Sequence, residues 1–328
     1  MRLLKLLFTP IVLLSIHEKI VAQDTTRPVN NQDTSNLMNQ LEKETGENKT
    51  VYTITTFKST RIINGHSIEN LPAHVLDVRI CHRFGPLNQG VYGFFGLDYS
   101  PFNVRVGLDY GITNNFMIGG GHNAWQKTYD AFLKLKLLRQ STGVVKMPVT
   151  VSFVPTIAIS TIKSGDFGFD PSDTASKKDR VSYVLQLLIG RKFSEGFSLQ
   201  IMPTFIYTDN ISFNHFKGNT YKRDIFAIGI GGRQKISKKM SINAEYYYQL
   251  PGTKAPDASD VVSLGIDIGT GGHVFQLHFT NSIGLTEKSF ISETNRKGYN
   301  SDIRFGFNIS RVFQLGKKNR SESTNWKK

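Results

Sequence analysis

Apolar and polar residues alternate strictly along the stretch from Asn103 to Gly121 (NVRVGLDYGITNNFMIGGG). Every second residue from Val104 to Ile112 is apolar, and the residues between them are polar or glycine. This period of two is typical of a β-strand with one apolar face and one wet face. The polar run Thr113–Asn115 reads as a turn, after which the alternation resumes at Phe116.

The same alternation predicts twelve strands along the chain. They span residues 75–84, 103–112, 116–121, 128–138, 147–162, 181–193, 197–208, 224–236, 241–250, 261–269, 273–283 and 302–315. Most of them reach the roughly 9–11 residues that a tilted strand needs to cross a bilayer. Strands of soluble proteins average only about 5–6 residues.

The connections between these strands alternate in length. Five are short, at residues 113–115, 140–146, 194–196, 237–239 and 270–272, and five are long, at 85–102, 163–180, 209–223, 251–260 and 284–301. One further outer connection, 123–127, is short. Short turns on one side and long loops on the other are typical of outer-membrane barrels. We therefore predict an all-β fold, an antiparallel up-and-down transmembrane β-barrel of about 12 strands spanning residues 75–315.

A few residues do not fit the alternation. Val184, Leu188 and Ile206 are apolar but fall on the face of their strands that is expected to be wet. The pattern alone gives no reason for them.

Four segments outside the barrel differ in composition. Residues 1–22 have a charged start and an apolar run that ends in small residues, which predicts an N-terminal signal peptide. Residues 23–50 are polar and predict a disordered linker. Residues 51–74 contain isoleucines between polar residues. The pattern leaves three roles open for this segment: a periplasmic lead-in, an extra strand or a plug in the lumen. Residues 316–328 form a basic tail.

Charge and cysteine content narrow the possible partners. The chain has a formal net charge of +14, but its basic residues are dispersed between apolar positions, so we expect no nucleic acid partner. Cys81 is the only cysteine, which excludes an internal disulfide. A mean hydropathy of −0.25 is compatible with a membrane barrel, because only every second strand residue meets lipid. The expected location is the outer membrane, reached by the signal peptide.

Several segments resemble a known family. They are Thr56–Asn88, Arg105–Gly119, Tyr129–Gly143, Gly190–Phe197, Gly271–Ser282 and Phe305–Phe313. Together they are similar to a β-barrel family of Bacteroidota that is catalogued as a domain of unknown function. The resemblance implies a barrel at the cell envelope and carries over no catalytic or binding residues.

Motifs that would indicate a nucleotide, catalytic or metal site are weak in this sequence. Glycine clusters such as Gly229–Gly232 do not precede a helix in a βαβ unit, so they do not indicate a nucleotide site. His278 and Thr280 share a strand face, as a base and a hydroxyl nucleophile would, but no orienting partner can be named. The histidines show no metal-ligand spacing. We expect no enzyme activity, no cofactor and no metal.

Charged residues on the wet faces are expected to line the lumen. They are Asp77, Arg79, Arg83, Arg105, Asp109, Asp130, Lys134, Lys136, Lys192, Arg233, Glu245, Asp267 and Arg304. Eight are positive and five negative, so an open pore would prefer anions; the same residues would equally suit cross-strand ion pairs in a filled interior. Two functions stay open: a channel or transporter for a small anionic solute, and a closed barrel that anchors or binds an envelope protein. A lipid-acting enzyme is a minor alternative.

Overall fold

The computed structural model describes residues 49–98, 102–163, 180–208, 224–254, 258–294 and 303–316. The predicted signal peptide lies outside these residues, as do the basic tail beyond residue 316 and all but the last two residues of the predicted linker. Among the described residues, none of the helices is long and apolar enough to cross a membrane.

Twelve antiparallel strands form a closed barrel, because β14 pairs with β2 and each of the others pairs with its neighbours along the chain. The strands are β2 (Val75–Pro86), β3 (Asn103–Gly111), β4 (Phe116–Asn123), β5 (Thr128–Leu138), β7 (Thr150–Ser160), β8 (Val181–Lys192), β9 (Phe197–Thr208), β10 (Asp224–Lys235), β11 (Met240–Gln249), β12 (Val261–Thr270), β13 (His273–Thr280) and β14 (Arg304–Gln314). The predicted fold class is confirmed. The ends of the predicted strands shift by up to three residues, as for 147–162 against β7.

Burial follows the alternation along each strand. On β3, Arg105 and Asp109 are buried while Val106 and Leu108 between them are about half exposed. The outward residues form the apolar surface that a membrane barrel presents to lipid, and the inward residues face the lumen. The sequence pattern therefore sets which side chains point inward.

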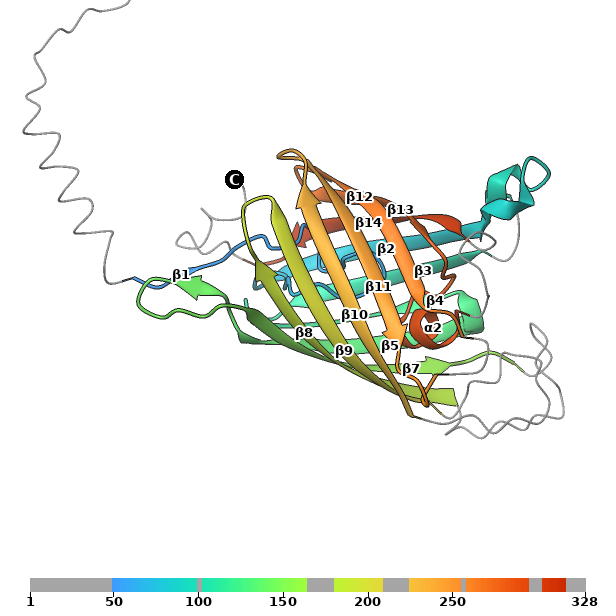
Figure 1. Ribbon diagram of the computed structural model, residues 1–328, viewed down its shortest axis with the longest axis horizontal. Helices are drawn as coiled ribbons and strands as arrows, with labels where there is room; N and C mark the ends of the chain where they lie inside the picture. The colour runs from blue at the N-terminus through green and yellow to red at the C-terminus, as the bar shows by residue number, and fades with distance from the viewer. Residues whose placement is uncertain are drawn as a thin grey trace, which may run out of the picture. The chain divides into compact units, whose positions relative to one another are not determined.

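The two ends of the barrel differ. At one end, here called the turn end, tight turns join the strands, as where Ile112 and Thr113 both donate to the carbonyl of Phe116. There, β1 (Val51–Tyr52) pairs with β6 (Ser141–Thr142), apart from the barrel sheet (Figure 1). The opposite end, the loop end, carries the long connections.

Short helices lie in the connections at the loop end. They are η1 (Leu87–Gln89), η2 (Phe94–Gly96), η3 (Trp125–Lys127) and α2 (Glu287–Ser292). Thr286 and Ser289 form a capping box that begins α2. Every residue of α2 is buried, which places this helix inside the mouth of the barrel (Figure 1).

Residues 53–74, here called the lumen segment, enter the barrel, and residues 59–68 of the segment are all buried there. The segment enters at the turn end, where Thr53 bonds to Gln140, and returns there, where the amide of His74 donates to the carbonyl of Gly111. Between these points it forms a hairpin: Arg61 pairs with His66, and the amide of Ile62 donates to the carbonyl of Gly65 at 2.9 Å. The tip of the hairpin therefore points toward the loop end and α2.

Candidate functional site

The tip of the lumen segment binds a carboxylate of the barrel wall. Both oxygens of Glu245 on β11 accept backbone N–H groups of the tip. The donor–acceptor distances are 3.1 Å from Ile63, 3.0 and 3.2 Å from Asn64, and 3.2 Å from Gly65. Consecutive N–H groups that converge in this way form an anion-binding nest, here filled by a wall side chain.

Polar side chains from other strands bind the backbone of the same segment. Gln200 on β9 accepts from the amide of Ile68 and donates to the carbonyl of His66, both at 2.7 Å. The amino group of Lys134 on β5 donates to three carbonyls, those of Thr60, Ser67 and Glu69. Further wall donors to backbone carbonyls of the segment are Arg233, Gln276 and Asn308. The wall thus supplies partners for many backbone N–H and C=O groups of the segment, in addition to the bonds within the hairpin.

Apolar side chains of the hairpin pack against the barrel wall. Phe57, Ile62, Ile63 and Ile68 are at most 2% exposed and share one apolar cluster with inward residues of the wall. Val184, Leu188 and Ile206, which do not fit the alternation in the sequence, belong to this cluster. Their apolar side chains face the isoleucines of the lumen segment instead of water.

Glycines on the wall let the isoleucines approach closely. A Cβ added at Gly190 on β8 would stand 2.7 Å from Cδ1 of Ile68, and one at Gly231 on β10 would stand 2.5 Å from Cδ1 of Ile62. Neither distance is compatible with a methyl group at an unchanged position. These two inward glycines therefore make room for the lumen segment.

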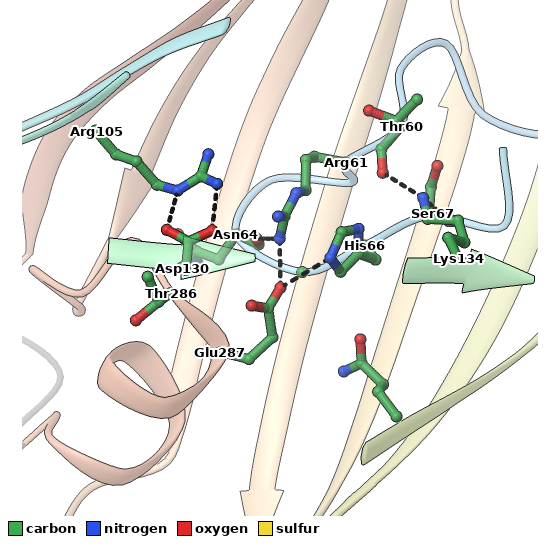
Figure 2. Close-up of polar contacts among 12 residues, drawn as sticks. Thr60, Arg61, Asn64, His66, Ser67, Arg105, Asp130, Lys134, Thr286 and Glu287 are labelled. Atoms are coloured by element: carbon green, nitrogen blue, oxygen red, sulfur yellow. Dashed lines mark hydrogen bonds and ion pairs between the residues drawn. The ribbon is translucent and has the colours of Figure 1, made fainter. Parts of the chain in front are cut away.

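The lumen segment and α2 contact each other inside the barrel (Figure 2). The guanidinium of Arg61 donates to the carboxylate of Glu287 at the start of α2, and Nε2 of His66 lies 3.5 Å from the same carboxylate. Burial lowers the pKa of His66 well below its ordinary value, and the charge of Arg61 lowers it further. His66 is therefore neutral at pH 7, and the ion pair of Glu287 is with Arg61.

The structure places the residues predicted to line the lumen as follows. Eleven of the thirteen are buried, and Lys136 and Lys192 are half-buried. Several are paired with each other: Arg79 lies 2.7 Å from Asp77, and Arg105 makes two bonds to Asp130 at 2.8 and 2.5 Å. Others bind the lumen segment, as Glu245, Lys134 and Arg233 do.

Sequence reasoning missed the neutral side chains Gln200, Gln276 and Asn308, which bind the lumen segment as directly as the charged ones. The available signal was their position on the inward face of the strands.

His278 is buried, and neither ring nitrogen has a hydrogen-bond partner among the described residues, while Thr280 bonds to Ser263 at 2.8 Å. The two thus do not form a base–nucleophile pair. In the described ranges, no group of three or more His, Cys, Asp or Glu residues is arranged to hold a metal ion.

Comparison with solved structures finds other barrels. The NanC porin has 9% identity and a TM-score of 0.44, with 72% of this chain and 98% of that one covered. The KdgM porin in complex with disordered oligogalacturonate has 8% identity, a TM-score of 0.44 and coverages of 73% and 99%. An outer membrane channel from Pseudomonas putida F1 has 13% identity, a TM-score of 0.43 and coverages of 75% and 98%. At these values the three proteins say nothing about what the present barrel binds.

No curated protein sequence matches the chain. The family described as "Membrane bound beta barrel domain (DUF5777)" matches residues 57–313. This range begins inside the lumen segment and ends in the last strand, so the family match covers both the barrel and the hairpin that fills it. The chain therefore belongs to this family of membrane-bound β-barrels.

Proposed function

We propose that the protein is an outer-membrane β-barrel channel for small solutes that is closed at rest by its own lumen segment. The observation that carries this proposal is the hairpin of residues 53–74. Its residues 59–68 are all buried in the lumen, and the hairpin is bonded to the wall from β2, β5, β9, β10, β11, β12, β13 and β14. Solute passes only when this segment leaves.

The charged wall favours a lumen that is sometimes wet. Thirteen charged residues line it, although a permanently filled interior is usually at least as stable with apolar side chains in place of buried ion pairs. Charged walls suit a water-filled passage. With the segment withdrawn, eight positive and five negative residues leave a net charge of 8 − 5 = +3, so the proposed passage prefers anions.

Withdrawal needs a source of free energy. Burying four large apolar side chains (Phe57, Ile62, Ile63 and Ile68) contributes about 6–12 kcal/mol, at about 1.5–3 kcal/mol each. Spontaneous release is therefore rare. We propose that a solute or an envelope protein supplies the difference, with the exposed strand β1 at the turn end, directly before the lumen segment, as the accessible point of attachment.

The apolar contacts also favour the second candidate, a permanently closed barrel that serves as an anchor or a binding platform. A reversible tether distinguishes the two. A Cβ at Gly190 would stand 3.0 Å from Cγ2 and 3.3 Å from Cγ1 of Ile68, both bonded to Cβ of Ile68. The two Cβ atoms would thus lie about 3.5 Å apart, at the short end of the range of a disulfide.

The experiment uses Ile68→Cys with Gly190→Cys in a Cys81→Ser background. Single-channel conductance is recorded in planar bilayers while urea is increased, because urea weakens the docking of the segment. We expect discrete steps from the reduced protein at urea concentrations where the oxidised protein is silent, with an anion-side reversal potential in a salt gradient. Each single cysteine variant is the control, since it should conduct in both redox states.

Two results contradict the proposal. Opening at the same urea concentration in both redox states would mean that the segment is not the gate. A barrel that stays silent even when residues 56–69 are replaced by a Gly-Ser repeat, with heat-modifiable migration showing that it is folded, would favour the closed platform.

A further inference from the structure

Two arginines stand on the lipid-facing side of the barrel. On β8 the outward positions are apolar or aromatic along Val181–Ile189, and the next outward position is Arg191. On β14 they are apolar along Phe305–Ile309, and the next is Arg311. Both arginines are exposed. In the twelve barrel strands, all of which lie in the described ranges, no other lysine or arginine is on the outward face.

Both arginines lie near the turn end. The strands β8 and β14 each run from the loop end to the turn end, and directly after β14 the amide of Leu315 donates to the carbonyl of His74. Arg191 is the second-last residue of β8, and Arg311 is three residues before the end of β14. A lipid-facing arginine is costly at the middle of a bilayer and costs little near its surface. These positions therefore suit the level of the lipid headgroups.

Aromatic rings contact both guanidinium groups. Cζ of Arg191 lies 5.1 Å from the ring centroid of Phe193, and Cζ of Arg311 lies 4.9 Å from that of Phe313. Each ring is two residues further toward the turn end, so both side chains lean away from the centre of the membrane, as long charged side chains do at interfaces. Among the described residues, neither guanidinium has a carboxylate or hydrogen-bond partner. Their N–H groups are thus available to a ligand.

The other exposed charges at the turn end are mostly positive. Lys146, Lys238 and Lys239 are exposed in its turns. The exposed carboxylate there, that of Glu195, is bound to Lys192 at 2.8 Å. Basic residues close to a membrane surface attract anionic lipids. The tight turns of outer-membrane barrels face the periplasm, so the charge lies beside the periplasmic leaflet.

We propose that Arg191 and Arg311 each bind the headgroup of an anionic phospholipid in the leaflet at the turn end. Two phosphate oxygens accept parallel N–H groups of the guanidinium, and the acyl chains lie along the apolar outward residues of the strands. Five strands separate β8 from β14 in either direction around the barrel, so the two sites hold separate lipids. This inference does not depend on the proposed channel, because the lipids bind outside the wall.

The test is native mass spectrometry of the refolded full chain in a neutral detergent. The chain is titrated with phosphatidylglycerol or with phosphatidylcholine of the same acyl chains. Both lipids carry a phosphate, but only phosphatidylglycerol has a net negative charge. We expect the wild type to retain two phosphatidylglycerol molecules, each bound about fivefold more tightly than phosphatidylcholine, which is the contribution of one basic residue near a membrane surface.

Arg191→Gln and Arg311→Gln should each remove one of the two retained phosphatidylglycerol molecules, and the double variant should bind the two lipids equally. Arg311→Lys should keep a weaker preference, because it retains the charge but loses the paired N–H groups. Lys238→Gln is the matched control. It removes a positive charge from the same end, but from the turn between β10 and β11, so it should still retain two molecules.

Equal binding of both lipids to the folded wild type would overturn the inference and would point to an acidic protein as the partner of this end. An unchanged preference in the double variant would overturn it as well. So would a loss in Lys238→Gln as large as that in Arg311→Gln, because the net charge of the turn end would then attract the lipid. Heat-modifiable migration shows that each variant is folded. These outcomes are independent of the tether experiment, which tests the lumen.

Discussion

Glu245 offers the sharpest test of how the lumen segment is held. Its carboxylate accepts the N–H groups of Ile63, Asn64 and Gly65 at 3.0–3.2 Å, from a position buried within β11. Glu245→Gln keeps the shape of the side chain but replaces one oxygen by an NH₂ group. That group points its own hydrogens at backbone N–H donors, so the variant removes acceptors without opening a cavity.

The expected magnitude follows from the count of donors. The remaining amide oxygen has two lone pairs and can accept from two of the three N–H groups, which leaves one without an acceptor. The unsatisfied donor costs about 1–3 kcal/mol, and the bonds that remain become roughly half as strong because the acceptor has lost its charge. A loss of about 3 kcal/mol in docking free energy corresponds to roughly a hundredfold change in the docking equilibrium, at about 1.4 kcal/mol per factor of ten.

Hydrogen exchange measured by mass spectrometry reports this equilibrium directly, because the tip amides exchange when the segment opens locally. We expect exchange of residues 63–65 to become roughly a hundredfold faster in Glu245→Gln, while the strand amides keep their protection. Asp130→Asn is the matched control: it makes the same carboxylate-to-amide change in the wall, but at a carboxylate that is paired with Arg105.

Unchanged exchange at residues 63–65 in a folded Glu245→Gln barrel would refute the claim that this carboxylate holds the tip. Equal acceleration in Asp130→Asn would also refute it, because the effect would then come from loosening of the wall in general.

Three further predictions concern the same segment. Gly65→Ala should undock the tip, because the added Cβ would stand 1.9 Å from the hydroxyl oxygen of Tyr247; Tyr247→Phe in the same chain should restore protection against exchange, since the next atom is 3.0 Å away. Gln200→Ala removes two backbone bonds of 2.7 Å and should speed exchange near Ile68 by about tenfold or more; normal exchange there would argue against a role for Gln200. His66 is kept neutral by a lowered pKa, so docking is strongest above its unfolded pKa of about 6.5 and weakens as pH falls below that value. The urea concentration needed for opening should therefore fall in acid, and His66→Gln should remove this dependence.

The strands were predictable from sequence because every strand has one face toward lipid and the other toward the lumen. Side chains of β3, such as Val106 and Leu108, must be apolar where they face the membrane, and the period of two records this without any knowledge of partners. The position of Glu245 or Lys134 on the inward face follows from the same alternation.

The contacts of the lumen segment were not predictable in this way. Arg61 and Glu287 are 226 residues apart, and neither lies on a barrel strand. Helix α2 has six residues inside a long connection, and its first turn depends on the capping box of Thr286 and Ser289. Such short elements are stabilised by tertiary contacts rather than by a local pattern, so the sequence leaves residues 51–74 open between a lead-in, an extra strand and a plug.

The exceptions to the alternation nevertheless carry information about the segment. Val184, Leu188 and Ile206 are apolar residues on the inward face of β8 and β9. The inward glycines Gly190 and Gly231 lie on β8 and on β10, which pairs with β9. These residues occupy one side of the lumen, whereas most of the inward charges lie on β2, β3 and β5. The isoleucines of the lumen segment pack on this side, and Arg79 on β2 and Lys134 on β5 bind polar groups of the segment on the charged side. Apolar residues and glycines that gather on the inward phase of adjacent strands therefore indicate an internal segment docked against them, and an inward phase that is polar throughout indicates a lumen that faces water.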